Sequence, residues 1–561
     1  MTEPATDTLV EVADLTVDFP AAEGPVRAVD GLSFRLAAGR ALGLVGESGS
    51  GKSTVAAALL DLHRGTGARV AGTVRVDGLD VLAAPDAALR RLRGGTAAMV
   101  FQDPLSALDP YHAIGDQIAE VHRVHRPGTS RRAARARAVE VLDRVGIADA
   151  ARQSRARPHE FSGGMRQRAL LAMALACEPR LLIADEPTTA LDVTVQAQIL
   201  DLLHELRAER GLGLILVTHD LAVAAGSVDE LLVLRDGRAV EHGPVAEVLG
   251  TPRAPYTKEL LAAVPRVDAV RGPAATGGRA VPEPDPGAPL LQATDLRREF
   301  GRGRARTTAV DGVSLTVSAG EVLGLVGESG SGKTTLGRML IRLSEPTAGS
   351  LRYRGREIGR LPERELRPLR REVQMVFQDP TSSLNPRRTI GESVADPLRA
   401  TGELDDREIV RRAQELLARV GLDPAWYHRY PHEFSGGQRQ RVGIARALAP
   451  APRLLVCDEP VSALDVTTQA QIVALLAELR GELGLALVFI AHDLAVVRAV
   501  SDRVAVMRAG RIVEEGPVDR VYDDPQHPYT QGLLAAVPVL DPQIAAGKRA
   551  LRASALDPVR P

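Results

Sequence analysis

The stretch GLVGESGSGKST, at residues Gly43–Thr54, returns almost unchanged as GLVGESGSGKTT at residues Gly324–Thr335. Each contains the pattern G-x-x-x-x-G-K-[ST], which follows a short apolar run and precedes a segment expected to be helical from the lysine onward. Glycines in such a loop let backbone N–H groups turn inward around phosphates, and the following helix adds its positive N-terminal end. The sequence therefore predicts two phosphate-binding loops in one chain.

The residues of each loop have separate expected roles. The lysine, Lys52 or Lys333, is expected to contact the β- and γ-phosphates of a nucleotide, and the hydroxyl of Ser53 or Thr334 is expected to bind Mg²⁺. The alternative is a glycine turn that only caps a helix. The other residues expected to contact ATP are Gly46, Glu47, Ser48, Gly49, Ser50, Gly51 and Thr54 in the first loop, and Gly327, Glu328, Ser329, Gly330, Ser331, Gly332 and Thr335 in the second.

Further blocks recur in the same order along the chain. They are VFQDP (Val100–Pro104 and Val376–Pro380), HEFSGGMRQR from His159 and HEFSGGQRQR from His432, Asp185-Glu186-Pro187 and Asp458-Glu459-Pro460, and Thr218-His219-Asp220 and Ala491-His492-Asp493. The sequence therefore predicts one duplicated domain, with copies at 1–265 and 290–541. The segment 266–289 is rich in Pro, Gly and Ala and is predicted to be a flexible linker, and 542–561 is predicted to be a tail of low order.

Composition narrows the class of protein. A chain of 561 residues suits two domains, and 70 basic residues against 71 acidic ones give no sign of a nucleic-acid partner. Two cysteines are too few for a disulfide framework, so two buried thiols are expected. The start of the chain does not resemble a signal peptide, and no apolar run approaches the ~18 residues of a membrane-spanning helix. A cytosolic protein is expected, and any membrane would belong to a partner.

The apolar pattern predicts an α/β fold. In the first copy, strand-like segments are expected at Val10–Phe19, Leu32–Leu36 and Ala41–Val45, followed by a helical insert over about Asp116 to Arg152. Buried strands are expected at Leu181–Ala184 and Leu214–Thr218, each with a helix behind it. Apolar strands that alternate with helices predict a mainly parallel sheet covered on both faces.

Two acidic residues end one buried strand of each copy. Asp185 and Asp458 suit the position that binds Mg²⁺ directly or through water in a Walker B strand. Glu186 and Glu459, one residue further on, suit a carboxylate that polarises the attacking water. An Asp-Glu pair that caps the next helix is the alternative.

The block SGG-x-R-Q-R stands just before each of these strands. Ser162, Gly163 and Gly164 in the first copy, and Ser435, Gly436, Gly437 and Gln438 in the second, resemble the signature motif of ABC ATPases, and the resemblance covers nearly the whole chain. A serine with free N–H groups at a helix N-terminus is a second anion site, although alone it would be a capped helix start. The resemblance implies two P-loop NTPase domains, each a RecA-like core with a helical subdomain, that bind and hydrolyse ATP with Mg²⁺.

The resemblance also assigns the remaining motifs. Gln102 and Gln378 resemble the Q-loop glutamines that sense Mg²⁺ and the attacking water, and His219 and His492 resemble switch histidines that contact the γ-phosphate. Ala190-Leu191-Asp192 and Ala463-Leu464-Asp465 resemble D-loops. Phe19 and Phe300, each 33 residues before its loop lysine, are expected to stack on adenine, with a core aromatic as the alternative.

In this family two such domains pair head to tail, with ATP between the phosphate loop of one and the signature of the other. Here this implies an intramolecular pair, in which Lys52, Asp185 and Glu186 face Ser435, and Lys333, Asp458 and Glu459 face Ser162. Both sites are expected to hydrolyse ATP. Met165, which stands where the second copy has Gln438, is the departure between the two signatures.

Two stretches resemble the dipeptide, oligopeptide and nickel importer family. They are QDPLSALDP and QDPTSSLNP after the Q-loops, and the tail QHPYTQGLLAAVP at Gln526–Pro538, whose first copy RAPYTKELLAAVP lacks the histidine. The resemblance implies two transmembrane permease subunits that dock near the Q-loops, an extracytoplasmic substrate-binding protein, and a place at the cytoplasmic face of the plasma membrane. Neither tail has a cysteine, so the cysteine cluster that some members carry is not expected.

Other tandem ATPases fit the sequence less well. A ribosome-binding translation factor would carry a long, charged helical linker, whereas the linker here is short and rich in Pro, Gly and Ala. A DNA-repair ATPase would need long coiled coils or zinc cysteines, and a sugar importer ATPase would need room for a β-rich regulatory domain. The sequence favours the motor of an importer, with di- or oligopeptides as the expected cargo.

Overall fold

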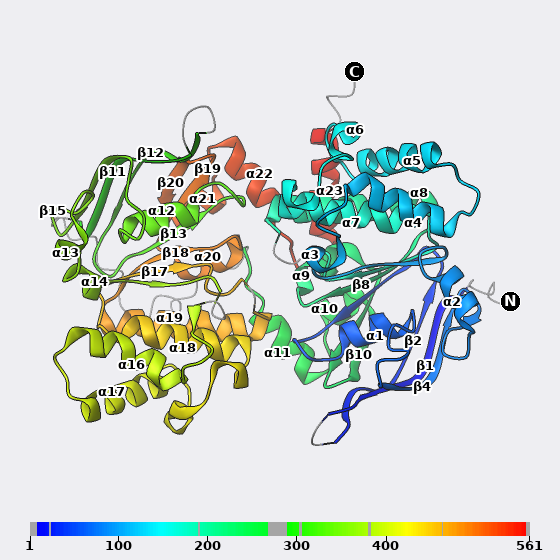
Figure 1. Cartoon of the computed structure of the whole chain (residues 1–561), viewed down its shortest axis with the longest axis horizontal. Helices are drawn as coiled ribbons and strands as arrows, with labels where there is room; N and C mark the ends of the chain where they lie inside the picture. The colour runs from blue at the N-terminus through cyan, green and yellow to red at the C-terminus, as the bar shows by residue number, and fades with distance from the viewer. Residues whose placement is uncertain are drawn as a thin grey trace. The chain divides into compact units, whose positions relative to one another are not determined.

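A computed structural model describes residues 8–21, 24–188, 191–267, 289–301, 306–379, 383–462 and 464–556 (Figure 1). The chain divides into two compact units, one formed by Met1–Val264 together with Pro538–Pro561 and the other by Pro265–Val537. Within the described residues, no helix is both long and apolar enough to cross a membrane.

The first unit contains two sheets. One has the strand order β10-β9-β3-β8-β7-β6, in which all neighbours run parallel except β9 and β10, and the other is antiparallel with the order β2-β1-β4-β5. The strands are β1 (Thr8–Phe19), β2 (Val26–Ala37), β3 (Ala41–Val45), β4 (Arg69–Val76), β5 (Leu79–Asp80), β6 (Ala97–Val100), β7 (Leu181–Asp185), β8 (Gly213–Thr218), β9 (Glu230–Arg235) and β10 (Arg238–Pro244).

Buried strands form the centre of the main sheet. Every residue of β3, β7 and β8 is buried, as expected for parallel strands covered on both faces. The expected strands at Ala41–Val45, Leu181–Ala184 and Leu214–Thr218 are confirmed to within one residue. The separate antiparallel sheet was not predicted, and the core of the unit combines apolar side chains from both sheets with those of α1 (Lys52–Ala58), such as Val55 and Ala58.

The helical insert is confirmed as three helices, of which α4 and α5 carry most of its length. It lies between β6 and the signature helix α7, and Figure 1 shows these helices together at one end of the unit. The helices of this unit after α1 are α2 (Asp86–Leu92), α3 (Pro104–Ala107), α4 (Ile114–His125), α5 (Arg131–Arg144), α6 (Ala150–Gln153), α7 (Gly163–Leu175), α8 (Val193–Arg210), α9 (Leu221–Ser227), α10 (Val245–Gly250) and α11 (Pro255–Ala263).

The second unit repeats both sheets, with the orders β16-β17-β18-β13-β19-β20 and β12-β11-β14-β15. Its strands are β11 (Leu291–Phe300), β12 (Thr307–Val317), β13 (Val322–Val326), β14 (Ala348–Tyr353), β15 (Arg356–Glu357), β16 (Val373–Val376), β17 (Leu454–Asp458), β18 (Ala486–Ile490), β19 (Arg503–Arg508) and β20 (Arg511–Pro517). Its helices are α12 (Lys333–Leu340), α13 (Glu363–Leu366), α14 (Leu369–Glu372), α16 (Ile390–Thr401), α17 (Asp406–Arg419), α18 (Gly436–Leu448), α19 (Val466–Leu483), α20 (Leu494–Val500), α21 (Val518–Asp523) and α22 (Pro528–Ala536).

The C-terminal segment corrects one expectation. Residues 542–561 were expected to have low order, but Pro542–Leu556 form the helix α23, which belongs to the first unit and packs on α9. The chain thus returns to its first unit after completing the second. Most of the linker predicted at 266–289 lies outside the described residues, as do Ala190 and Ala463 of the two D-loops.

Candidate active site

The three strands that carry the motifs of the first unit end at the same edge of its main sheet. β3 leads into the phosphate loop, β7 ends at Asp185, and β8 ends at Thr218, one residue before His219. Because β7 and β3 both pair in parallel with β8, their carboxyl ends meet at one edge. The second unit repeats this arrangement with β13, β17 and β18.

The first and last glycines of each loop are required by close backbone contacts. Gly46 has φ 152°, and a Cβ atom there would lie 2.2 Å from the carbonyl oxygen of Leu234. Gly51 has φ 96°, and its Cβ would lie 2.4 Å from the carbonyl oxygen of Ala28. Gly327 and Gly332 repeat both contacts in the second unit, at 2.1 and 2.2 Å. No other residue type fits these positions without moving the strand behind the loop.

The loop lysines fold back over their own loops. Lys52 Nζ donates to the carbonyl oxygens of Gly46 at 2.8 Å and Glu47 at 2.7 Å, and Lys333 Nζ makes the same two bonds at 2.7 and 2.8 Å. Both lysines are buried, and a buried ammonium needs such partners. These carbonyls therefore hold the charge close to the place where the β- and γ-phosphates are expected.

The hydroxyl of each loop meets the last residue of its Walker B strand. Ser53 Oγ donates to Asp185 Oδ1 at 3.0 Å, and Thr334 Oγ1 donates to Asp458 Oδ1 at 2.8 Å. Burial raises the pKa of both aspartates, against the hydrogen bond from the hydroxyl. Within the described residues no group of three His, Cys, Asp or Glu side chains could hold a metal. A hydroxyl and one carboxylate suit Mg²⁺, which takes few protein oxygens and completes its shell with phosphates and water.

The expected catalytic residues of each unit form one hydrogen-bonded cluster. In the first unit, Gln102 Nε2 donates to Glu186 Oε2 at 2.8 Å, and His219 Nδ1 lies 3.1 Å from Glu186 Oε1. Glu186 has φ 46°, a strained backbone conformation for a glutamate that is typical of functional sites. Burial alone would lower the pKa of His219, but the hydrogen bond and charge of Glu186 outweigh burial and raise it.

The second unit has the same cluster, but its histidine lies farther from its glutamate. Gln378 Nε2 donates to Glu459 Oε2 at 2.7 Å, while His492 Nδ1 lies 3.5 Å from that oxygen. Burial would raise the pKa of Glu459, but its contact with His492 and the charge of Lys333 lower it. Glu459 also has a left-handed backbone, with φ 45°. A carboxylate held ionised at the sheet edge can polarise a water molecule.

The signature residues begin the helices α7 and α18. Ser162 Oγ accepts a hydrogen bond from the Met165 N–H, and Ser435 Oγ accepts one from Gln438, both at 3.3 Å. Gln438 Oε1 also accepts from the Ser435 N–H at 2.9 Å, a bond that Met165 cannot make. The difference between the two signatures is therefore one capping interaction at the helix start.

Comparisons with known proteins agree with this geometry. The model of the ABC transporter family matches residues 29–189 and 310–462, and that of the oligopeptide/dipeptide transporter C-terminal region matches 240–289 and 513–558. The chain is 45% identical over 571 aligned residues to the glutathione import ATP-binding protein GsiA of Salmonella typhimurium, covering 97% of this chain and 92% of that protein. GsiA of Escherichia coli O157:H7 is 45% identical over 575 residues with the same coverage.

This chain belongs to the ABC transporter family. Each unit is an ATP-binding and ATP-hydrolysing cassette, and each cassette is followed by a tail of the oligopeptide/dipeptide transporter type. The second tail match, 513–558, includes α23, so this helix is part of the tail region.

The two aromatic residues expected to stack on adenine lie in different surroundings in the two cassettes. Phe19 packs against the core, and its ring meets His63 edge to face with centroids 5.3 Å apart. Phe300 is 44% exposed, and the guanidinium of Arg298 lies 4.8 Å above its ring. In the second cassette Arg298 would have to move before that ring face could stack on a base.

Sequence reasoning missed one contact with the phosphate loop. Tyr256 of the first tail and Tyr529 of the second place their hydroxyl groups against the backbone N–H groups of Glu47 and Glu328, at 3.2 and 3.1 Å. The available signal was the repetition of Pro-Tyr-Thr in both tails, which served only to identify the family.

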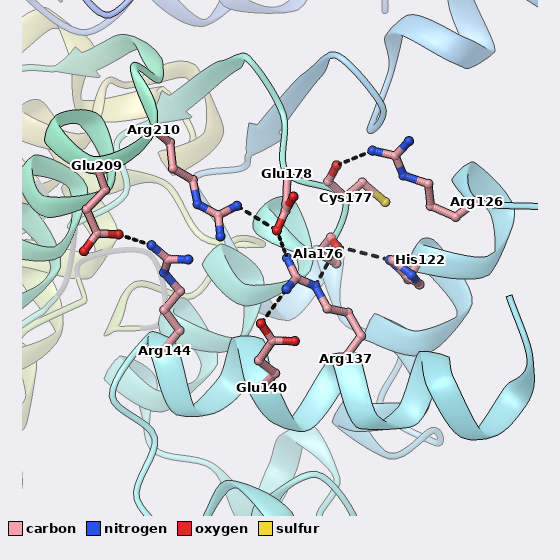
Figure 2. A network of polar contacts seen from close by, with 10 residues as sticks. All are labelled: His122, Arg126, Arg137, Glu140, Arg144, Ala176, Cys177, Glu178, Glu209 and Arg210. Carbon is pink, nitrogen blue, oxygen red and sulfur yellow. Dashed lines mark hydrogen bonds and ion pairs between the residues drawn. The ribbon is translucent and has the colours of Figure 1, made fainter.

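A polar network in the first cassette links α5 of the helical subdomain to the connection before β7 and to α8 (Figure 2). Glu178, in the short connection between α7 and β7, accepts from Arg137 of α5 at 2.9 Å and pairs with Arg210 of α8 at 2.8 Å. Arg137 also donates to the carbonyl of Ala176 at 3.1 Å. Ala451 occupies the position of Glu178 in the second copy, so this arginine–glutamate–arginine link is a feature of the first cassette.

Proposed function

We propose that this protein is the motor of an importer of di- or oligopeptides. In this proposal the protein binds two transmembrane permease subunits at the cytoplasmic face of the plasma membrane, and its ATP hydrolysis drives uptake of cargo through them. An extracytoplasmic binding protein delivers the cargo to the permeases. The observation that carries the proposal is the Gln–Glu–His cluster beside a phosphate loop, present in both cassettes, together with a peptide-transporter tail after each cassette.

The chemistry assigned to each site follows from its hydrogen bonds. Glu186 is oriented by Gln102 and His219, so its carboxylate can accept a proton from, or polarise, a water aimed at the γ-phosphate. Lys52 leaves the carbonyls of its loop for the phosphates, and the backbone N–H groups of the loop stabilise their charge. Mg²⁺, when bound beside Ser53 and Asp185, neutralises phosphate charge. Lys333, Thr334, Asp458, Glu459 and His492 take the same roles in the second cassette.

The two cassettes are proposed to work as a head-to-tail pair. The Lys52 site is then completed by Ser435, and the Lys333 site by Ser162, so that bound ATP closes the pair and hydrolysis lets it open. Each signature serine begins a helix whose first N–H groups can receive an anion, which supports this role. Both sites carry the full set of catalytic residues and are proposed to hydrolyse ATP.

A cavity beside the second Q-loop supports docking of a permease helix. It has a volume of about 550 Å³ and lies between the core strand β16 and the helical subdomain, lined by Gln374, Phe377, Gln378, Pro397 and Arg446. A permease segment bound there would touch Gln378, whose amide holds the catalytic Glu459. Docking and catalysis would thereby share one residue.

The peptide cargo is proposed from the family of the tails and from the names of the relatives. The curated relatives are named for glutathione import, and glutathione is a tripeptide. A ribosome-bound translation factor, the alternative reading of a tandem ABC protein, is not favoured because the matched relatives are import ATP-binding proteins over 97% of this chain.

Steady-state ATP hydrolysis tests the motor assignment. Wild type is compared with Glu186→Gln, Glu459→Gln and the double variant. Loss of activity in the double variant is expected, with substantial activity left in each single variant if the sites work independently. A single variant that falls to the level of the double variant means that the sites are coupled or that only one is catalytic. Full activity in the double variant would overturn the assignment of both glutamates.

Uptake tests the cargo separately. Cells that express the chain with its permeases and binding protein are given a labelled tripeptide, and uptake is expected to require both Glu186 and Glu459. If ATP hydrolysis is intact but no peptide is taken up, the assignment as an ATP-hydrolysing motor stands and the proposal of a peptide cargo is wrong.

A further inference from the structure

The tail tyrosines contact the phosphate loops in the same way in both cassettes. The hydroxyl of Tyr256, on α11, accepts from the Glu47 N–H, and that of Tyr529, on α22, accepts from the Glu328 N–H. Burial raises the pKa of Tyr529 to about 12 and also raises that of Tyr256, so both hydroxyls stay protonated at neutral pH. The contact is therefore present in both copies of the duplicated domain.

Tyr256 and Lys52 bind opposite sides of the same peptide group. The Glu47 N–H and the Gly46 carbonyl belong to the same planar peptide, and that carbonyl accepts from Lys52 Nζ at 2.8 Å. Tyr256 thus fixes one side of a peptide whose other side binds the ammonium group. Hydrogen bonds in such a chain polarise and strengthen one another. Tyr529, Glu328, Gly327 and Lys333 repeat the chain in the second cassette.

The tyrosine rings are held in place by the strand that crowds the loop. The Arg235 guanidinium lies 4.7 Å above the Tyr256 ring, and the Arg508 guanidinium lies 4.9 Å above the Tyr529 ring. Arg235 follows Leu234, whose carbonyl oxygen excludes any side chain at Gly46. The start of the phosphate loop therefore lies between the end of β9 and the tail.

The tail is fixed to its own cassette just before the tyrosine. Glu241 of β10 accepts from the N–H groups of Arg253 and Ala254 at 2.8 and 3.2 Å, and α11 begins at the next residue. Glu514 of β20 holds the N–H groups of Gln526 and His527 in the same way, at 2.8 and 3.1 Å. Each tyrosine is thus presented to its loop from a helix whose start is anchored to the sheet.

We propose that Tyr256 and Tyr529 are positioning residues that keep the first peptide of each phosphate loop in its nucleotide-binding orientation. This assigns a role to the tails: they preorganise the ATP sites of the cassettes that precede them. Without the hydroxyl, only Lys52 among the described residues holds the Gly46–Glu47 peptide. When the lysine leaves for the phosphates, none of those residues fixes the orientation of this peptide, so nucleotide binding must order it. The catalytic Glu186 and His219 keep their contacts, so the chemical step at saturating ATP is unaffected.

The inference rests on the proposed assignment of the phosphate loops and predicts a change in affinity without a change in turnover. In the full chain, Tyr256→Phe with Tyr529→Phe removes two hydroxyls and keeps both rings. We expect the Kd for the fluorescent nucleotide N-methylanthraniloyl-ADP and the KM for ATP to rise about threefold to tenfold, as for the loss of one hydrogen bond per site, with kcat unchanged.

Tyr522→Phe is the matched control. Tyr522 lies in the same second tail and donates its hydroxyl hydrogen to the Leu494 carbonyl at 2.7 Å, away from the phosphate loop. This variant is expected to keep the wild-type Kd and KM. An equal rise in the control, a Kd unchanged in the double tyrosine variant, or a fall in kcat with constant KM would each overturn the proposal.

A separate variant distinguishes failure of this inference from failure of the proposed function. Lys52→Ala with Lys333→Ala is expected to abolish binding of the fluorescent nucleotide. If that variant still binds it with wild-type affinity, the loop assignment itself is wrong. If it does not bind while the tyrosine variant behaves as wild type, only the role of the tails is refuted.

Discussion

Arg552 of α23 forms a bidentate ion pair with Asp201 of the first cassette. Its Nε and Nη2 atoms lie 2.8 and 2.7 Å from the two carboxylate oxygens. Asp201 is on α8, and the neighbouring Arg549 donates to the carbonyl of Gly226 at the end of α9 at 2.6 Å. In the second copy Ala474 stands at the position of Asp201, so only the first cassette offers this partner. The pair is one of the contacts that attach α23 to the first unit.

This ion pair is expected to stabilise the first unit by about 1 kcal/mol, since both side chains are only partly exposed and the geometry is bidentate. Asp201→Ala and Arg552→Ala should each lower the free energy of unfolding, and the double variant should cost little more than either one. Denaturant unfolding of the four chains measures the coupling. Strictly additive losses would show that the two side chains do not interact in solution.

The Glu186–His219 contact predicts a pH dependence. Glu186 raises the pKa of His219, so the protonated histidine and Glu186 stabilise the folded cassette. This stabilisation is fully present below the ordinary histidine pKa of about 6.5, and it is lost as the pH rises through the raised pKa of His219. Glu186→Gln removes the partner, so burial should then dominate and the pKa of His219 should fall. Titration of ¹³C-labelled histidine signals measures both values, with His219→Ala identifying the signal. An unchanged His219 pKa in the glutamine variant would contradict the contact.

Two glycines of the signature helix α18 offer a matched pair of packing tests. A Cβ atom at Gly437 would lie 2.3 Å from Thr468 Cγ2 of α19, whereas one at Gly443 meets nothing within 4 Å. Gly437→Ala is therefore expected to lower the free energy of unfolding by about 1–3 kcal/mol through overpacking. Gly443→Ala should be neutral or stabilise the protein by up to about 1 kcal/mol, because alanine restricts the unfolded chain and favours the helix. Equal effects would show that the α18–α19 contact is looser than the structure indicates.

Much of the arrangement of the site could be predicted because its residues lie in sequence motifs that directly follow apolar strands. The loop that carries Lys52 follows β3, Asp185 ends β7 and His219 follows β8, and buried parallel strands such as these read as continuous apolar runs. Once the strand ends are known, parallel pairing brings the motifs to one edge without further information.

The features that could not be predicted depend on contacts between residues far apart in the sequence. Tyr256 and Glu47 are 209 residues apart, and the Tyr256 hydroxyl accepts from the backbone N–H of Glu47, a contact that neither stretch of sequence signals by itself. The helix α23 was missed because its order comes from tertiary contacts with Asp201 and Gly226 and not from a strong apolar period. Strands were expected at Val10–Phe19 and Leu32–Leu36, within β1 and β2, but their pairing into a separate antiparallel sheet was not predicted, because a strand pattern does not record which strand is its neighbour.

The two thiols supply an unfolding probe for each unit. Both cysteines are free and buried, one in each cassette, which confirms the expectation from the sequence. Burial raises the pKa of Cys457 to about 12 and also raises that of Cys177, so almost no thiolate forms near pH 8. Iodoacetamide should therefore leave both thiols unmodified in the native protein and label both in denaturant.

Nucleotide should slow that labelling, because a ligand that binds only the folded state lowers the population of opened molecules. At about 100 times its Kd, ADP should slow labelling about 100-fold wherever modification requires the nucleotide site to unfold. Cys457 directly precedes Asp458, which places it on the strand that carries the second site, so its labelling should respond fully. Cys177 lies before β7 and beside α4, where its Sγ is 3.9 Å from the Val121 carbonyl. If it is labelled by local opening of the helical subdomain, its rate should respond less to ADP. Mass spectrometry of the two cysteine peptides separates the rates, and rapid labelling of Cys457 in the native protein with or without ADP would contradict its burial.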